Sequence, residues 1–196
     1  MTGKDIWKIT LNLVVIYLAG GLILALVYAR TSPIIYRNAV LAKEVALKTL
    51  VPEADSIEKL GDWTIHQKNA EYFIAKKNGA VIGYVVQSYG KGYSSYIDTL
   101  FAVDRDFRVR TISILGHAET PGLGDEIESS SFRSQFSGKD IDHLKVLKKD
   151  TSYYIQAISG ATISSRAVSE DAVRNGLDFL IKAVTSEGAH GKDRSD

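Results

Sequence analysis

A stretch of uncharged residues near the start of the chain constrains its fold most. Twenty-one consecutive residues, from Ile9 to Ala29, carry no formal charge. As a helix they would span roughly 31 Å, which matches a bilayer hydrocarbon core of about 30 Å. A cleaved signal peptide is the alternative, but its apolar region of about 7–15 residues is shorter. We therefore expect an uncleaved transmembrane helix at 9–29 that crosses the lipid bilayer once.

Charge and cysteine content remove several classes of function. The formal net charge is +1 with 24% charged residues, and no basic stripe interleaved with aromatic residues appears, so nucleic acid is not an expected partner. The chain has no cysteine, which removes disulfides, iron–sulfur clusters and thiolate zinc sites from it. Any iron in an assembly with this chain must therefore belong to its partners.

The residues after the apolar run predict a second helix and then one domain. From Pro33 to Leu50, apolar and basic residues recur with helical spacing, which predicts a juxtamembrane helix within 30–52. Residues 53–186 are enough for one hydrophobic core and predict a single domain. The last residues, 187–196, are polar and predict a flexible tail.

The strand pattern of this domain favours an α+β fold with a mainly antiparallel sheet. Two apolar runs flank the turn dipeptide Asn78-Gly79, which is a hairpin signal. Two further runs flank a short turn at 104–106, and neighbouring runs joined by short turns pair antiparallel. The expected strands are Tyr72–Ala75, Ala80–Ser88, Tyr96–Val103 and Phe107–Leu115, with a strand-like run at Tyr153–Ile158.

Two helices are expected to flank this sheet. A short one near 129–136 would begin at serine caps and bury Phe132 and Phe136. A longer one near 164–184 carries an apolar stripe at four-residue spacing, in which Gly176 would mark a close contact with the sheet. The stripe is Val168, Ala172, Gly176 and Leu180.

A run of small and hydroxyl residues stands between the last strand-like run and the last helix. It reads Ser159-Gly160-Ala161-Thr162-Ile163-Ser164-Ser165. Free N–H groups and the positive end of the helix dipole favour an anion at such a turn, and Gly160 with Ala161 lets the backbone approach it closely. One interpretation makes Thr162 the attachment point of a cofactor phosphate. The other makes Ser164 or Ser165 a helix cap.

A second motif stands about forty residues upstream and reads His117-Ala118-Glu119-Thr120-Pro121-Gly122-Leu123-Gly124. Its proline and glycines preset a turn whose backbone can approach a flat ligand. His117 and Glu119 lie two residues apart and could face one way at a strand end, which would also suit a metal. Because no third ligand is apparent nearby, we expect no metal site.

Together the two motifs resemble those of a known family. S-G-A-T-x-S and H-x-E-T-P-G-L-G are signatures of an FMN-binding domain found in the G-type subunits of Rnf electron-transport complexes and the C-type subunits of sodium-pumping NADH:quinone reductases. The resemblance covers nearly the whole chain, from the membrane anchor to the C-terminal helix. The length of 196 residues favours the Rnf complex, and the quinone reductase remains the alternative.

The resemblance implies a covalent flavin. FMN would be joined by a phosphodiester to Thr162, after a separate flavin transferase uses FAD and magnesium and releases AMP. Glu119 and Thr120 would orient the ring or bond its polar edge, and Leu123 would cover its dimethylbenzene part. The candidate cofactor-binding residues are Thr162, Ser159, Gly160, Ala161, Ser164, Ser165, His117, Glu119, Thr120, Pro121, Gly122, Leu123 and Gly124.

The resemblance also implies a role and a place in the cell. The chain would relay electrons in a complex that couples electron flow between ferredoxin and NAD to movement of sodium ions or protons, with iron–sulfur and flavin subunits as partners. It is not expected to be catalytic alone. The family has a short cytoplasmic N-terminus, here 1–8, and a domain outside the bacterial or archaeal cytoplasmic membrane.

Two questions stay open on the residues alone. Basic residues flank the apolar run on both sides, Lys4 and Lys8 before it and Arg30 and Arg37 after it, so the positive-inside rule does not orient the helix. A membrane-anchored module that binds a small ligand or a partner, without flavin, is the alternative from another class of function.

Overall fold

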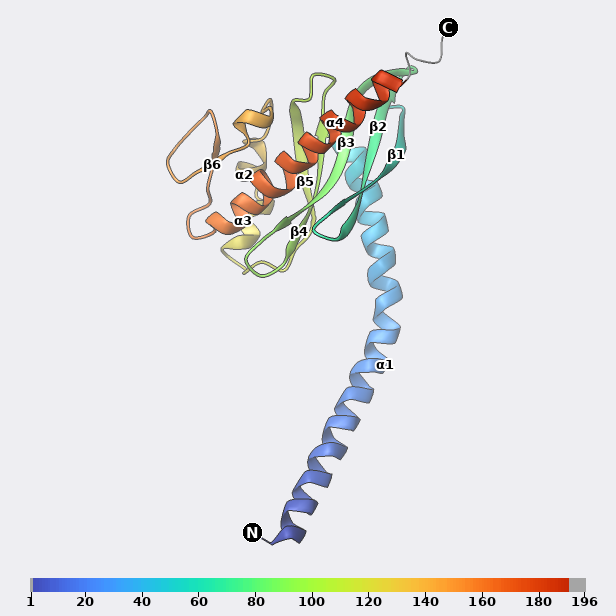
Figure 1. Ribbon diagram of the computed structural model, residues 1–196, viewed down its shortest axis with the longest axis vertical. Helices are drawn as coiled ribbons and strands as arrows, with labels where there is room; N and C mark the ends of the chain where they lie inside the picture. The colour runs from blue at the N-terminus through green and yellow to red at the C-terminus, as the bar shows by residue number, and fades with distance from the viewer. Residues whose placement is uncertain (1, 191–196) are drawn as a thin grey trace. The chain divides into compact units, whose positions relative to one another are not determined.

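The computed structural model describes residues 2–190, with side chains through residue 186 (Figure 1). The chain divides into two compact units, one up to Ala42 and one from Lys43 onward. The first unit is helical, and the second contains a five-stranded sheet with its covering helices. The predicted α+β fold class is confirmed.

A single helix, α1 (Gly3–Leu50), contains both the apolar run and the segment for which the sequence predicts a separate juxtamembrane helix. Pro33 lies inside α1. A proline removes one backbone donor, and apolar helices of membrane proteins tolerate this where neighbouring turns keep their bonds. The helix is long and apolar enough to cross a membrane, with a mean hydropathy of 2.3 in its most apolar part.

The sheet is an antiparallel meander in which each strand pairs with the next along the chain. The hairpin predicted at Asn78-Gly79 is present, and both residues have the positive φ that its turn requires. The strands are β1 (Ser56–Ile65), β2 (Lys68–Lys77), β3 (Ala80–Lys91), β4 (Tyr96–Val103) and β5 (Val109–Gly116).

Strand β1 is not among the strands that the sequence predicts. This strand is at the edge of the sheet. Half of its ten residues are polar, nine of the ten are at least partly exposed, and its register shifts between Lys59 and Gly61, so it lacks the apolar alternation that marks a strand. Its turn to β2 is made by His66 and Gln67, both with positive φ, where the usual signal would be asparagine and glycine.

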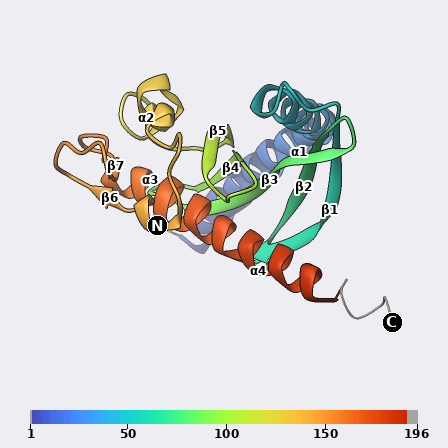
Figure 2. The same cartoon turned by 90° about the horizontal axis from the view of Figure 1, so that it is seen from above.

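The helical layer on one face of the sheet is a succession of three elements: α3 (Thr162–Arg166), a π-helical segment η3 (Ala167–Val173) and α4 (Arg174–His190) (Figure 2). The predicted stripe of Val168, Ala172 and Leu180 is fully buried against the sheet. Residues 187–190 of the predicted tail belong to α4, and 191–196 lie outside the described residues.

Glycines allow this layer to approach the sheet closely. A Cβ on Gly90 of β3 would lie 1.8 Å from the carbonyl oxygen of Ala167, and a Cβ on Gly176 would lie 2.9 Å from the Phe101 ring. The expected close contact at Gly176 is confirmed. The start of the layer, including Thr162, is thereby held on the sheet by backbone contact.

The opposite face of the sheet carries a smaller apolar cluster. The end of α1 contributes Ala46 and Leu50, which pack with Phe73 and Val85 of the sheet. All four are at least nine-tenths buried.

A long segment of short elements joins β5 to α3. It comprises η1 (Gly124–Glu128), α2 (Ser130–Ser134), η2 (Ile141–His143), β6 (Val146–Leu147) and β7 (Ile155–Gln156). In the predicted short helix, the hydroxyl of Ser129 accepts a bond from the backbone N–H of Phe132, and Phe132 and Phe136 are buried as expected. The predicted strand at 153–158 is reduced to β7, which pairs in parallel with β6.

We expect Gly90→Ala to lower the free energy of unfolding by about 3 kcal/mol, because the added methyl would overlap the Ala167 carbonyl and push η3 from the sheet. Gly116→Ala is the matched control, since a Cβ at the end of β5 has no neighbour within 4 Å. Denaturant unfolding of the full chain in detergent micelles, followed by circular dichroism, measures both. Equal stability of the two variants would contradict this account of the packing.

Candidate functional site

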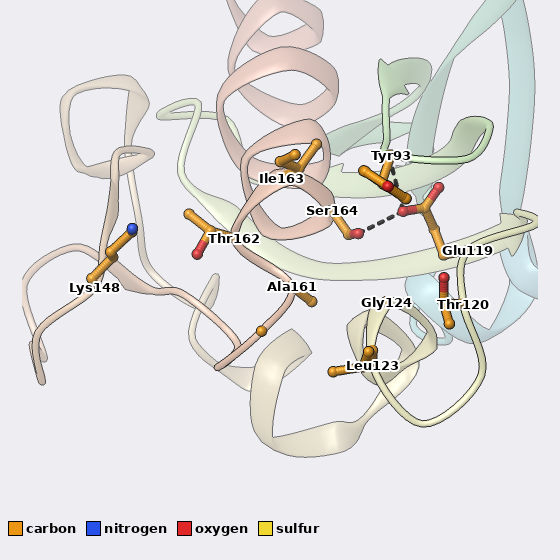
Figure 3. Close-up of a pocket in the computed structure, with 11 residues that line it drawn as sticks. Tyr93, Glu119, Thr120, Leu123, Gly124, Lys148, Ala161, Thr162, Ile163 and Ser164 are labelled. Carbon is orange, nitrogen blue, oxygen red and sulfur yellow. Dashed lines mark hydrogen bonds between the residues drawn. The ribbon is translucent and has the colours of Figure 1, made fainter.

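The two motifs meet at one cavity of about 530 Å³ (Figure 3). The 117–124 loop lies on one side of it, and the start of α3 lies on another. Two residues come from outside the motifs, one after β3 and one after β6. The lining residues are Tyr93, Glu119, Thr120, Leu123, Gly124, Lys148, Gly160, Ala161, Thr162, Ile163 and Ser164.

The carboxylate of Glu119 joins three segments of this site. It accepts hydrogen bonds from the backbone N–H groups of Tyr93, Ser94 and Ser95 at 3.0–3.1 Å. It also accepts one from the hydroxyl of Ser164 in α3, at 2.5 Å (Figure 3). Glu119 is 4% exposed, so its charge is balanced by these donors more than by water. The carboxylate therefore fixes the β3–β4 connection, its own loop and the start of α3 relative to one another.

These contacts also set the pKa of Glu119. Burial by itself would raise the pKa, because it disfavours the charged form. The hydrogen bonds from Ser164 and from the three backbone N–H groups outweigh burial and hold the pKa of the carboxyl below its ordinary value. Glu119 is therefore ionised at neutral pH, which suits a group that accepts every one of these bonds.

Glycines surround the carboxylate and the turn before α3 for steric reasons. A Cβ on Gly92 would lie 2.5 Å from a carboxylate oxygen of Glu119, and one on Gly124 would lie 2.7 Å from its Cβ. Gly160 has a φ of 80°, and a Cβ there would lie 2.8 Å from the side chain of Leu123. The glycines of both motifs thus allow the two loops to come together.

The hydroxyl groups of the S-G-A-T-I-S-S motif have different surroundings. The hydroxyl of Ser165 accepts a bond from the backbone N–H of Ile158 and donates one to the carbonyl of Ala161, which closes the turn. Ser164 donates to Glu119. Ser159 is exposed and does not line the cavity. Thr162 lines the cavity, is partly buried, and has a hydroxyl without a hydrogen bond to any described residue.

The interpretation of Ser164 or Ser165 as the cap of this helix is therefore wrong, because neither side chain bonds the first N–H groups of α3. No side chain in the described chain caps α3, because its N-cap position is held by Ala161. Both serines are buried and bonded elsewhere, one across the site and one within the turn. The first backbone N–H groups of α3 are left without an intrahelical partner, as at any helix start.

Not every predicted residue reaches the cavity. His117, Pro121, Gly122, Ser159 and Ser165 lie outside its lining. The Nδ1 of His117 accepts a bond from the backbone N–H of Glu119 at 3.0 Å, and its Nε2 lies 3.1 Å from a carboxylate oxygen of Glu128. The His117 ring thus bonds within its own loop and to the end of η1.

Three lining residues were missed or left undecided by the sequence analysis. Tyr93, left between core and pocket, is 74% exposed at the cavity rim. Ile163 stands inside the motif, where an apolar residue gives no special signal. Lys148 belongs to neither motif. It reaches the cavity because β6 pairs with β7, and no pattern in the sequence predicts this pairing.

We expect Glu119→Gln to lower the free energy of unfolding at pH 7 by about 2 kcal/mol, because an amide N–H₂ would face backbone donors. A carboxyl whose pKa is lower in the folded state than in the unfolded state stabilises the fold at pH values above its unfolded pKa. This stabilisation is lost as the pH falls through the folded pKa. The difference between parent and variant should therefore shrink as pH falls below 4.5, the ordinary value for Glu119.

Glu126→Gln provides the control for this pH dependence, because the Glu126 side chain is exposed and lies outside the cavity lining. Denaturant unfolding of the full chain from pH 7 to pH 3 gives the comparison. Parallel pH profiles for Glu119→Gln and Glu126→Gln would show that the Glu119 carboxylate does not stabilise the site.

Comparison with known proteins agrees with this geometry. Residues 92–178, which include both motifs, match the model of the FMN-binding domain. The chain is 39% identical over 93% of its length to the G-type subunit of the proton-translocating ferredoxin:NAD(+) oxidoreductase complex of Clostridium ljungdahlii, and covers 94% of that protein. It is 30% identical to the G-type subunit of the ion-translocating oxidoreductase complex of Methanosarcina acetivorans, with 90% of this chain and 95% of that protein covered.

A solved structure shares the fold of the domain. It is the C-type subunit of the Na(+)-translocating NADH-quinone reductase from Parabacteroides distasonis, which is 30% identical, has a TM-score of 0.50, and is matched over 58% of this chain and 62% of its own. The corresponding protein of Vibrio alginolyticus is 32% identical, but only 49% of its length is covered. The match covers nearly the full length of the G-type proteins but about half of the C-type protein, so the chain groups with the G-type subunits. The chain belongs to the family of G-type subunits of Rnf-type ion-translocating oxidoreductase complexes and carries an FMN-binding domain.

Proposed function

We propose that this protein relays electrons through one FMN joined to Thr162 by a phosphodiester bond. One observation carries the proposal: Thr162 is the hydroxyl of the S-G-A-T-I-S-S motif that both lines the cavity and is unbonded within the described chain. The serines that follow it at 164 and 165 are committed to fixed hydrogen bonds. A modifying enzyme therefore meets Thr162 as an available nucleophile.

The cavity has the features that a flavin needs. Its volume of about 530 Å³ lies within the usual range for small-molecule sites. Gly124 and Gly160 let the two loops that form its walls come together, and the apolar side chains of Leu123 and Ile163 are half exposed at its edge. A bound flavin supplies one- and two-electron chemistry that no side chain of this chain offers.

The residues of the chain have distinct parts in this proposal. Thr162 holds the phosphate, and Leu123, Ile163 and Tyr93 provide apolar surface for the ring. Glu119 holds the three segments of the pocket together through its hydrogen bonds. Its carboxylate thus has a structural task in addition to the expected contact with the polar edge of the ring. The hydroxyl of Thr120, unbonded among the described residues, lies in the lining and keeps that role.

Attachment is a group transfer carried out by a separate enzyme. The Thr162 oxygen forms a bond to the FMN phosphorus of FAD, the anhydride bond to AMP breaks, and the hydroxyl proton is released. Magnesium on the transferase would neutralise the leaving phosphate. No redox change occurs in this step. A covalent link keeps the cofactor at high effective concentration in its site, and loss by dissociation is prevented.

The proposed partners are the iron–sulfur and flavin subunits of the complex. The chain has no cysteine to hold a cluster, so its electrons must come from and go to cofactors on other subunits. The apolar helix α1 anchors the chain in a membrane. We propose that α1 crosses it once, with residues 1–8 in the cytoplasm and the FMN-binding domain outside the cytoplasmic membrane.

We expect Thr162→Ala to abolish covalent flavin, because it removes the proposed attachment atom while the structural serines remain. Each variant is produced with its flavin transferase, denatured, and measured by intact mass and in-gel flavin fluorescence. Ser159→Ala is the matched control, since it removes an exposed hydroxyl of the same motif that does not line the cavity. It should retain one FMN per chain. Full flavin on Thr162→Ala would assign the linkage to another residue.

The absence of native cysteine allows a clean test of topology. We expect a membrane-impermeant maleimide to label Lys77→Cys, at the exposed end of β2, on intact cells whose outer membrane or cell wall lets the reagent through. Lys4→Cys, before the apolar run, should react only after lysis. The opposite pattern would place the domain in the cytoplasm, and labelling of both in intact cells would exclude a single crossing.

A further inference from the structure

We infer that Lys148 is a phosphate-binding residue of this site, and that its ammonium group pairs with the phosphodiester at Thr162. The inference rests on the proposed attachment of FMN at Thr162. It adds a residue from outside both sequence motifs, and it assigns that residue to the phosphate end of the cofactor.

The side chain of Lys148 is placed for this contact. It lines the same cavity as Thr162, and its nitrogen points toward the side on which the threonine side chain lies (Figure 3). The carboxylate of Glu119 lies on the far side of the start of α3, beside Tyr93. The Lys148 ammonium group and Thr162 thus lie at one end of the cavity, and Tyr93 with the Glu119 carboxylate lies at the other (Figure 3).

The backbone that carries Lys148 is fixed to the segment that carries Thr162. Lys148 follows β6 directly, and the residues before Thr162 follow β7, which pairs with β6 in parallel. Two further bonds extend this ladder: the N–H of Ile155 donates to the carbonyl of Lys145, and the N–H of Ala157 donates to that of Leu147. The strand that precedes Lys148 is therefore paired with the strand that precedes the turn to Thr162.

A side-chain bond ties the same ladder to the helical layer. The backbone N–H of Val146 in β6 donates to the carboxylate of Glu170 at 2.8 Å. Glu170 lies in η3, which continues the helix that begins at Thr162. Lys139 reinforces the loop after Lys148 by donating to the carbonyls of Ser152 and Tyr153. These contacts limit how far Lys148 can move from Thr162.

No charged group of the lining occupies the Lys148 ammonium group, so it is available to bind an anion. The lining contains two charged side chains of opposite sign, Glu119 and Lys148. Glu119 is occupied by four hydrogen bonds within the protein. Lys148 makes no ion pair or hydrogen bond with any described residue. A phosphodiester carries one negative charge at neutral pH, which this ammonium group can balance by a charge-assisted hydrogen bond.

Two other lysines, one adjacent to Lys148 and one near the glycine-tyrosine stretch, are not placed to bind the phosphate. Lys91, which the sequence places near the glycine-tyrosine stretch, is exposed and lies outside the cavity lining, and its backbone N–H donates to Asp171. Lys149 is adjacent to Lys148 and is exposed like it, but Lys149 lies outside the lining. Lys149 therefore provides a matched control with the same charge and nearly the same position in the chain.

The test uses the full chain in detergent micelles, with carbon-13 at the lysine Cε, before and after loading by the transferase with FAD and magnesium. Peptide mapping first establishes that FMN is on Thr162. The NMR signal of Lys148, identified by its loss in Lys148→Gln, should move on loading more than that of any other lysine. The phosphorus-31 signal of the linkage should shift in Lys148→Gln, stay close to the parent in Lys148→Arg, and not change in Lys149→Gln.

Two outcomes would overturn the inference, and they are distinguishable. If FMN is on Thr162 but the Lys148 signal stays in place, or the phosphorus signal is the same in Lys148→Gln and the parent, then Lys148 does not bind the phosphate and the proposed function stands. If the chain takes up no FMN at Thr162, the proposed function fails, and the inference about Lys148 fails with it.

Discussion

The arrangement of the site depends on one buried carboxylate. Glu119 is nearly inaccessible to solvent, and a charge in such a position is tolerated only where hydrogen-bond donors replace water. Here the donors come from two other segments, the connection after β3 and the start of α3. Because those segments must converge on the carboxylate for it to remain charged, the folded domain brings the loop motif and the threonine motif together.

The rest of the domain gives these segments fixed positions. The five-stranded meander supplies a platform, and the helical layer is set against it through Gly90 and Gly176, where any side chain would collide. The short β6–β7 ladder then fixes the turn before Thr162 from the other side. Within the motif, Ser164 and Ser165 are held by hydrogen bonds inside the protein, which leaves Thr162 as the cavity-lining hydroxyl of the motif that bonds no described residue.

Much of this could be predicted from sequence, because the informative signals are local. Each of three features follows from the residues of one segment: the uncharged run, the Asn78-Gly79 hairpin and the apolar stripe of the last helix. The two motifs indicate a flavin domain by their residue order. The edge strand β1 could not be predicted in this way, since an exposed edge needs few apolar residues.

The sequence predicts which residues form the site better than it predicts what each residue does. The resemblance implies that Glu119 orients the ring or bonds its edge. The four hydrogen bonds of Glu119 give it a structural task as well, which depends on residues 93–95 and Ser164, distant along the chain. Lys148 was missed for a similar reason. Its approach to Thr162 depends on the parallel pairing of two strands of two residues each, and no pattern within so short a strand marks its partner.

The most direct test of this account is the location of the flavin on the unaltered chain. Protein made with its transferase is digested, and the flavin peptide is fragmented by electron transfer, which preserves the phosphodiester while it cleaves the backbone. The account predicts one added FMN, less water, on Thr162 and none on Ser159, Ser164 or Ser165. A flavin on any of those serines or on Thr120 would contradict it, as would a chain that remains unmodified.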